Sequence, residues 1–117
     1  MLIFKIVTAA DWAEAERAGS FAGSAHDQAD GFLHFSIGPQ LAETLRLYYA
    51  GQDNLVLVAV DPAPLGAALK WEHAPSRGED FPHLFAALPL AAVKWTAPIV
   101  RDAQGTAIIP AMALARD

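Results

Sequence analysis

The sequence predicts a single α+β domain over residues 1–117, with a bent or split, mainly antiparallel sheet and two main helices. Three observations predict this fold. Helix patterns follow the first two strand-like segments, several short strand-like segments follow the third, and residues 55–60 form a continuous β-prone run. A regular doubly wound sheet would need more helices late in the chain, so that architecture is excluded.

The first expected elements are a strand over residues 2–7 and a helix over residues 11–18. Thr8 is expected to cap the helix, because Asp11 stands three residues later as in a capping box with a shorter acid. Gly19 is expected to end it. The helix residues predicted to face the core are Trp12 and Ala15.

The next segment, residues 20–30, is small and polar and has the period of neither a helix nor a strand. It is expected to form a loop that leads into a strand over residues 32–37. Because strand side chains alternate between two faces, three residues of this strand should share one polar face. They are Phe32, His34 and Ser36.

The second half of the chain is expected to carry one more helix and several strands. The helix follows Gly38-Pro39 and ends at Gly51, because its apolar residues have helical spacing. The expected strands are a central one at 55–60, one at 69–72 that places Lys70 and Glu72 on one face, one at 81–85, and an edge strand at 93–99. Residues 73–80 are expected to form a mobile loop.

Composition excludes several classes of function. The net charge is −5 and the eight basic residues are scattered, so non-specific nucleic-acid binding is not expected, although one phosphorylated ligand remains possible. The chain has no cysteine, which rules out disulfides and thiolate chemistry. No apolar stretch approaches the ~20 residues of a membrane span, and the cytoplasm is the expected compartment.

Two polar faces could carry chemistry. His34 and Ser36 could orient a hydroxylated ligand, since a neutral imidazole both donates and accepts hydrogen bonds. The alternative is a core histidine that bonds to a backbone carbonyl. Lys70 and Glu72 could supply a cation for an anionic group and a carboxylate that acts as base or ribose acceptor. The alternative for them is a solvated ion pair.

Other constellations are weaker. His26, Asp27, Asp30 and His34 have ligand types that suit a divalent metal, but their spacing matches no established zinc signature, so no metal site is expected. His73 and His83 could add a proton-transfer group or be separate surface histidines. Ser24 and Ser76 lack the G-x-S-x-G context of a hydrolase nucleophile.

Four motifs together carry a resemblance to a known family. In chain order they are Gly23-Ser24-x-x-Asp27-x-x-Asp30-Gly31-Phe32-Leu33-His34-Phe35-Ser36, Leu55-Val56-Leu57-Val58-Ala59-Val60-Asp61, Leu69-Lys70-Trp71-Glu72 and Phe81-Pro82-His83-Leu84-Phe85. They resemble a bacterial family known as domain of unknown function 952. Its members look like distant relatives of the ADP-ribosyltransferase fold, a split two-sheet architecture that grips NAD in a cleft.

This resemblance implies residue roles. The H-x-S of His34 and Ser36 is similar to the pair that holds the nicotinamide ribose in that wider fold, and Glu72 stands as the candidate for its catalytic glutamate, with His34 beside it. Lys70 or Arg77 would meet phosphate. The candidates for substrate binding are Ser24, Asp27 and His83.

Two functions follow as hypotheses. The first is a small domain that binds an NAD-like or ADP-ribose-like ligand and acts as an ADP-ribosyl or related transferase. The alternative is a non-catalytic ligand-binding or protein-interaction module on the same fold. They differ in whether His34, Ser36 and Glu72 converge on one pocket. The oligomeric state is left open by the sequence.

Overall fold

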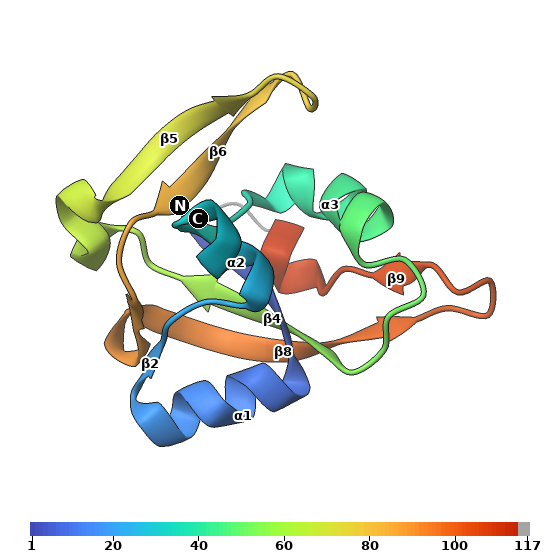
Figure 1. The fold of residues 1–117 in the computed structure, drawn as a ribbon. Coiled ribbons are helices and arrows are strands. Elements are labelled where there is room, and N and C mark those ends of the chain that lie inside the picture. Colours follow the sequence, from blue (N-terminus) through green and yellow to red (C-terminus); the bar gives the residue numbers. More distant parts are fainter. Residues whose placement is uncertain (115–117) are drawn as a thin grey trace.

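Most strands of the chain form two antiparallel sheets, which are drawn in Figure 1. The structure is a computed structural model and describes residues 1–114. The main sheet has the order β1-β4-β8-β9, formed by Ile3–Thr8, Leu55–Val60, Val93–Arg101 and Ala107–Ile108. The smaller sheet has the order β3-β6-β5, formed by Leu33–His34, Glu79–Leu84 and Leu69–Ala74. A third, two-stranded pairing joins β2 (Ser20–Phe21) to β7 (Leu88–Pro89).

Three α-helices accompany the sheets: α1 at Ala9–Ala18, α2 at Ala25–Asp30 and α3 at Leu41–Tyr48. Short 3-10 helices connect the elements. They are η1 at Gly38–Gln40, η2 at Ala63–Ala68, η3 at Leu90–Ala92 and η4 at Ala111–Leu114. The predicted α+β class with a split antiparallel sheet is therefore confirmed at this level. No described helix is long and apolar enough to cross a bilayer.

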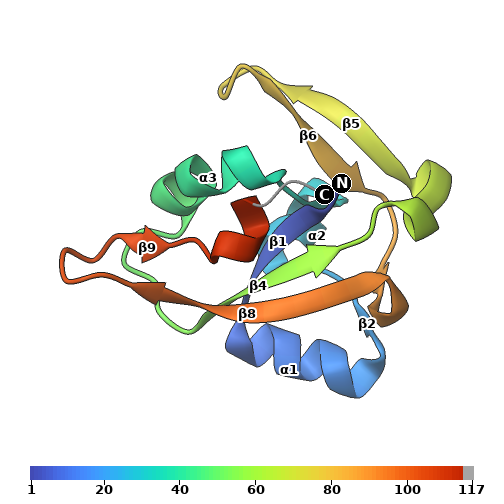
Figure 2. The same ribbon diagram turned by 180° about the vertical axis from the view of Figure 1, so that it is seen from behind.

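Strand β4 is the centre of the main sheet, as its continuous apolar run predicts. Leu57, Val58, Ala59 and Val60 are all buried, because their side chains enter two cores on opposite faces of the sheet. Helix α1 covers one face through Trp12 and Ala15, and helix α3 covers the other, as Figure 2 shows from behind. The α3 residues in the second core are Leu41 and Leu45.

The two sheets meet at residues 35–36. Phe4 of β1 exchanges backbone hydrogen bonds of 2.8 Å with Ser36 in both directions, while the Phe35 N–H donates to the Pro82 carbonyl of β6 at 3.0 Å. The chain therefore leaves the small sheet at Phe35 and joins the main sheet one residue later. Beyond this crossover the β5–β6 hairpin projects away from the main sheet (Figure 1).

The first helix forms as predicted. The Thr8 hydroxyl accepts a hydrogen bond from the Asp11 N–H at 3.1 Å, and Gly19 ends the helix with a left-handed φ of 86°. Trp12 lies against Phe21 of β2, with ring centroids 6.2 Å apart. This contact holds α1 to the segment that leads into α2.

Two expectations about loops were wrong. Residues 20–30 are not a loop, because β2 and the short helix α2 occupy most of them. Residues 73–80 are not one either, because β5 runs to Ala74 and β6 starts at Glu79, which leaves a tight turn that contains Gly78. Both segments lacked an apolar period, yet cross-strand hydrogen bonds and a capping box order them.

The edge-strand expectation for residues 93–99 agrees with the sheet order. Strand β9 pairs only with Val100 and Arg101 of β8, so the outer edge of residues 93–99 has no described strand partner. Pro98, which has no N–H to donate, is accommodated at that position.

Candidate functional site

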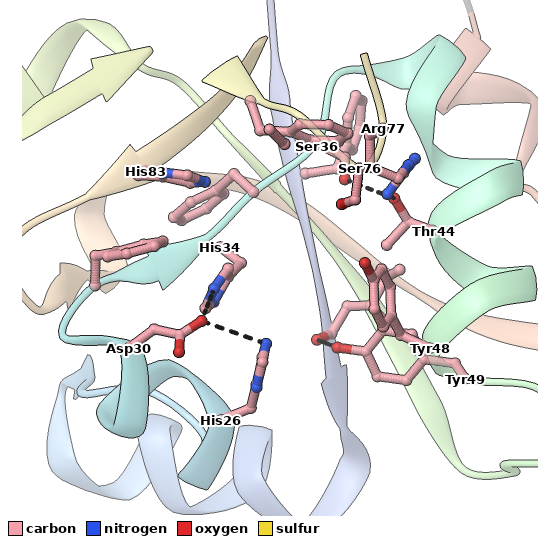
Figure 3. A pocket seen from close by; sticks show the side chains of 16 residues that line it. His26, Asp30, His34, Ser36, Thr44, Tyr48, Tyr49, Ser76, Arg77 and His83 are labelled. Atoms are coloured by element: carbon pink, nitrogen blue, oxygen red, sulfur yellow. Dashed lines mark hydrogen bonds and ion pairs between the residues drawn. The ribbon is translucent and has the colours of Figure 1, made fainter. Parts of the chain in front are cut away.

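A cavity of about 340 Å³ lies between the two sheets. Its floor is β1, through Phe4 and Ile6, and its walls come from α2 and β3 on one side and α3 on the other (Figure 3). The β5–β6 hairpin contributes the remaining side, with Arg77 and His83 among its lining residues. Figure 3 shows polar side chains from α2, β3, α3 and the hairpin around one space.

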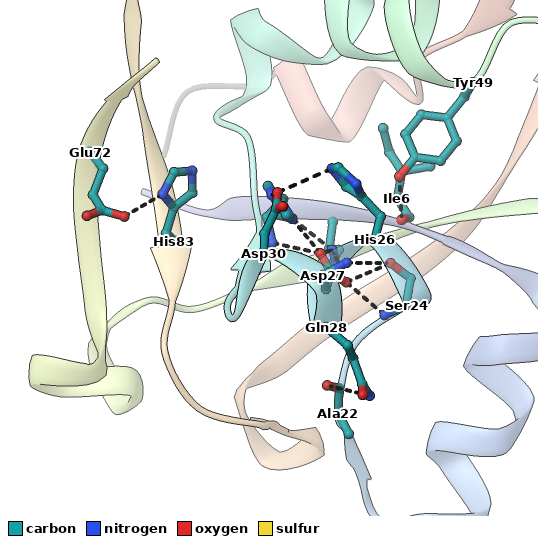
Figure 4. A network of polar contacts seen from close by, with 12 residues as sticks. Ile6, Ala22, Ser24, His26, Asp27, Gln28, Asp30, Tyr49, Glu72 and His83 are labelled. Carbon is teal, nitrogen blue, oxygen red and sulfur yellow. Dashed lines mark hydrogen bonds and ion pairs between the residues drawn. The ribbon is translucent and has the colours of Figure 1, made fainter. Parts of the chain in front are cut away.

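The wall formed by α2 and β3 is held by one buried carboxylate. Asp27 is 2% exposed, and its side chain closes the capping box of α2 by accepting the Ser24 N–H at 2.9 Å. The same carboxylate accepts the backbone N–H of His34 at 3.1 Å. Asp27 therefore ties the start of the helix to the strand that follows it (Figure 4).

Lys5 is the buried cation that balances this carboxylate. It is 4% exposed, and its Nζ lies 3.0 Å from Asp27 Oδ1 and 2.9 Å from Asp27 Oδ2. Burial alone would raise the pKa of Asp27, but its hydrogen bonds to His34 and Ser24 and its pairing with Lys5 hold that pKa well below the usual range. Burial lowers the pKa of the Lys5 ammonium, and Asp27 offsets part of that effect.

The imidazole of His34 stands between two carboxylates. Its Nδ1 is 2.6 Å from Asp27 Oδ1, and its Nε2 is 2.8 Å from Asp30 Oδ2. His26 joins from the preceding turn of α2, with Nε2 3.6 Å from the same Asp30 oxygen. The ring of His34 is thus oriented from both ends, at a position that lines the cavity.

A row of rings lines this side of the cavity. Phe32 stacks on His83 with centroids 4.1 Å apart and lies 4.6 Å from His34, which in turn stacks on His26 at 4.6 Å. The predicted common face of Phe32, His34 and Ser36 is therefore present, since all three line the cavity. Such a row offers flat surfaces for a planar heterocycle.

The hairpin presents a second histidine with its own carboxylate. His83 Nδ1 lies 2.7 Å from Glu72 Oε1 across the β5–β6 ladder. The strand register places His83 opposite Lys70, so Glu72 is its diagonal neighbour on the same face. This arrangement orients the His83 ring while its edge stays at the cavity.

A cationic corner closes the hairpin side. Arg77 donates to the Thr44 hydroxyl at 3.1 Å, and that hydroxyl lies 3.3 Å from Ser36 Oγ. The guanidinium carbon also lies 4.6 Å from the centroid of the Phe81 ring. These contacts use part of the five-donor guanidinium and leave donors for an anionic ligand.

Two tyrosines at the end of α3 lie across the cavity from the α2–β3 wall (Figure 3). Tyr48 is 55% exposed, whereas Tyr49 is packed against the second core and its hydroxyl lies 3.5 Å from the Ile6 carbonyl. Burial, and secondarily the charge of Asp27, raises the pKa of the Tyr49 phenol. Both rings are therefore apolar surfaces with a polar tip at the cavity.

The structure brings together some of the predicted site residues and separates others. His34, Ser36, Arg77 and His83 all line the cavity. Glu72 is outside the lining and contacts the lining residue His83. Ser24 and Asp27 are also outside the lining, and Asp27 contacts His34 while it caps α2 with Ser24. Lys70 is not part of the lining, and its Nζ lies 5.2 Å from the centroid of the Phe85 ring.

Other lining residues were not among the predicted site residues: His26, Asp30, Thr44, Tyr48, Tyr49 and Ser76. The sequence did offer a signal for Tyr48 and Tyr49. Adjacent residues of a helix point in different directions, so only one of the two could belong to the buried stripe, and the other had to lie at a surface or a site. Thr44 and Ser76 had no signal, since their role comes from the approach of the hairpin to α3.

Comparisons with known proteins agree on a family and a fold. Residues 6–96 match the family described as "Protein of unknown function (DUF952)". An X-ray structure of protein CC0527 from Caulobacter crescentus is 43% identical, with a TM-score of 0.91, and the match covers 98% of this chain and 100% of that chain. A solution NMR structure of CC0527 is 47% identical, with a TM-score of 0.79 and 89% of each chain covered. No curated protein matches.

Proposed function

The chain belongs to the DUF952 family of proteins of unknown function, and we propose that its cavity binds an NAD-like or ADP-ribose-like ligand. The observation that carries the proposal is the convergence of a ring-lined wall and a cationic corner on one cavity. The rings belong to Phe32, His34 and His83, and the corner to Arg77 with Thr44 and Ser36.

The cavity residues match the parts of such a ligand. Ring faces suit a base or nicotinamide, hydroxyl groups of Ser36 and Thr44 suit a ribose, and the guanidinium of Arg77 suits a phosphate. Small-molecule sites commonly enclose about 300–1,000 Å³. The cavity volume of about 340 Å³ is at the lower end of that range, which suits one nucleoside-sized half of a dinucleotide.

Transfer of an ADP-ribosyl group is the finer form of this proposal. In that reaction a nucleophile would replace nicotinamide at the ribose C1′ carbon, and a carboxylate would stabilise the developing positive charge. The carboxylate of Glu72 is bound to His83 Nδ1 and is not in the cavity lining. This observation favours the second candidate, a binding module without turnover. Glu72 would then orient His83 as part of the binding surface.

Calorimetric titration tests binding, with NAD, ADP-ribose and AMP as probes. Wild type is expected to bind at least one of them, and Arg77→Ala is expected to weaken that binding by about tenfold or more, the loss of roughly 1.4 kcal/mol. Lys70→Ala is the matched control, because this cation lies outside the cavity lining. Absence of binding at millimolar ligand, or equal losses in the two variants, would overturn the proposal.

Turnover is measured separately by following the release of nicotinamide from NAD. Release that depends on Glu72 supports the transferase. Binding without release supports the binding module. Both assays use the same protein samples. A sample that binds ligand is folded, so its failure to release nicotinamide cannot be attributed to misfolding.

A further inference from the structure

We propose that His26, Asp30 and His34 form a binding site for a divalent transition-metal ion of the zinc class, on the α2–β3 wall of the cavity. The side chains offer two imidazole nitrogens and one carboxylate oxygen, and these three atoms all lie within 4.8 Å of one another. Within residues 1–114, this is the one group of three histidine or acidic side chains with that closeness. Two histidines and one carboxylate are a donor set that binds zinc and related ions.

Local structure explains how a spacing without a zinc signature can still form a site. His26 and Asp30 are four residues apart, so they lie on the same face of α2 in successive turns. Gly31 then reverses the chain with a left-handed φ of 84°, and β3 brings His34 back beside that face. The sequence alone gave no reason to place His34 there, and no metal was expected from it.

The hydrogen bonds of His34 supply an independent argument. Asp27 Oδ1 lies 2.6 Å from His34 Nδ1, so a buried carboxylate fixes the orientation of the ring and turns Nε2 toward Asp30 Oδ2, 2.8 Å away. The two donor atoms Nε2 and Oδ2 therefore already point toward one place, and a metal ion bound there would replace their direct contact. A carboxylate on the far nitrogen is also the usual support of a metal-bound histidine.

The site must rearrange slightly to hold an ion. Zinc–ligand distances of about 2.1 Å in tetrahedral geometry imply donor separations of roughly 3.4 Å. His34 Nε2 and Asp30 Oδ2, now 2.8 Å apart, must separate, whereas His26 Nε2 and Asp30 Oδ2, now 3.6 Å apart, must approach slightly. The side chains of His26 and Asp30 are 70% and 42% exposed, so small rotations of both can supply these changes.

Three protein donors leave at least one coordination position open. All three residues line the cavity, so that position faces the same space as Arg77 and His83. An ion there would attract an anionic oxygen of a molecule in the cavity or lower the pKa of a bound water. The inference does not rest on the proposed nucleotide ligand, because metal binding can be measured without one.

The test is titration of Co²⁺ and Zn²⁺ into untagged, chelator-treated full-length protein. Cobalt binding is followed by its visible d–d absorption, and zinc binding by competition and by calorimetry. Wild type is expected to bind one equivalent with a d–d band typical of nitrogen and oxygen ligands. His26→Ala and Asp30→Asn are each expected to weaken binding at least tenfold.

His73→Ala is the matched control. His73 and Asp80 form another exposed histidine–aspartate pair, 3.0 Å apart, that is not part of a three-donor group. This variant is expected to bind the ion as wild type does. Failure of wild type to bind either ion, or losses in His73→Ala equal to those in His26→Ala, would overturn the proposal.

Metal-free wild type separates this proposal from the proposed function. Chelator-treated wild type should still bind NAD or ADP-ribose if the nucleotide proposal holds, because the rings and Arg77 need no ion to contact that ligand. Metal binding without nucleotide binding would support the metal site alone. Circular dichroism of each variant establishes that a loss reflects a missing donor rather than unfolding.

Discussion

Two sides of the cavity, the α2–β3 wall and the hairpin wall formed by β5 and β6, each present a histidine whose Nδ1 contacts a carboxylate. The two carboxylates are placed very differently. The distances are almost equal, 2.6 Å for His34 to Asp27 and 2.7 Å for His83 to Glu72. The side chain of Asp27 is 2% exposed and that of Glu72 is 43% exposed. Asp27 also binds Lys5 and the α2 capping box, whereas Glu72 stands on a projecting hairpin (Figure 4).

The same histidine–carboxylate contact therefore has a different role on each side of the cavity. The Asp27 pair is part of the framework, because its carboxylate holds a helix, a strand and a buried ammonium together. The Glu72 pair lies on the hairpin and joins only two neighbouring strands, so its loss should cost the fold little. We therefore expect the α2–β3 wall of the cavity to be the rigid one and the hairpin wall to be the adjustable one.

The largest expected effect is that of Asp27→Asn. It leaves the Lys5 ammonium buried without its anion, and breaking a buried pair in this way costs about 3–5 kcal/mol. Glu72→Gln is the matched change on the other wall and should cost less than about 1 kcal/mol, because the Glu72 carboxylate is 43% exposed and its replacement leaves no buried charge unpaired. Urea unfolding of the two variants measures both values. Equal losses would remove the distinction between the walls.

The difference in the free energy of unfolding between wild type and Asp27→Asn should become smaller in acid. The pKa of Asp27 is lower in the folded chain than in the unfolded chain, so its contribution to the free energy of unfolding is fully present above the unfolded value of about 3.9. The contribution is lost as the pH falls through that value toward the folded one. Unfolding curves at neutral pH and in steps below about pH 4 measure this difference. A difference that is constant with pH would contradict this account.

Gln40→Ala should loosen the adjustable wall. Gln40 is 3% exposed, and its amide donates to the Asp80 carbonyl at 2.9 Å while its Oε1 accepts the Ile37 N–H at 3.0 Å. Removal of a buried partner costs about 1–3 kcal/mol. Faster amide hydrogen exchange in β6, with little change in α1, is the expected signature. Uniform acceleration across both would show that Gln40 supports the whole domain instead.

The smallest expected effect is that of His73→Ala on the outer face of the hairpin. Its contact with Asp80 is 3.0 Å long but lies between side chains that are 58% and 62% exposed. Exposed pairs contribute about 0–1 kcal/mol, so thermal unfolding should be nearly unchanged. A loss as large as that of Gln40→Ala would mean that the hairpin face carries stability that its exposure does not indicate.

Some of the fold could be predicted because single segments determine it. The apolar run of β4 needs no partner to be recognised, and α1 carries its own cap, Thr8, and its own stop, Gly19. Helix α2 has a cap, Ser24, and a stop, Gly31, like those of α1, but the analysis of its six residues missed it because they have no apolar stripe. Its Asp27 also pairs with Lys5, which lies 22 positions away in the chain and could not be linked to it by local pattern.

The candidate site divides in the same way. The shared face of Phe32, His34 and Ser36 follows from strand alternation, which is a local property. The contact of Glu72 with His83 requires the register of the hairpin, and the contact of Arg77 with Thr44 requires the distance between the hairpin and α3. Such long-range contacts are set by packing, and no spacing in the sequence encodes them.

The hairpin that forms the adjustable wall also carries Trp71, which is 44% exposed. The other two tryptophans lie elsewhere: Trp12 is in the core under α1, and Trp95 packs against the opposite core. The chain therefore holds a natural fluorophore in each of its three principal regions. Single-tryptophan versions would report, by emission wavelength and quenching, whether ligands move the hairpin while both cores stay still.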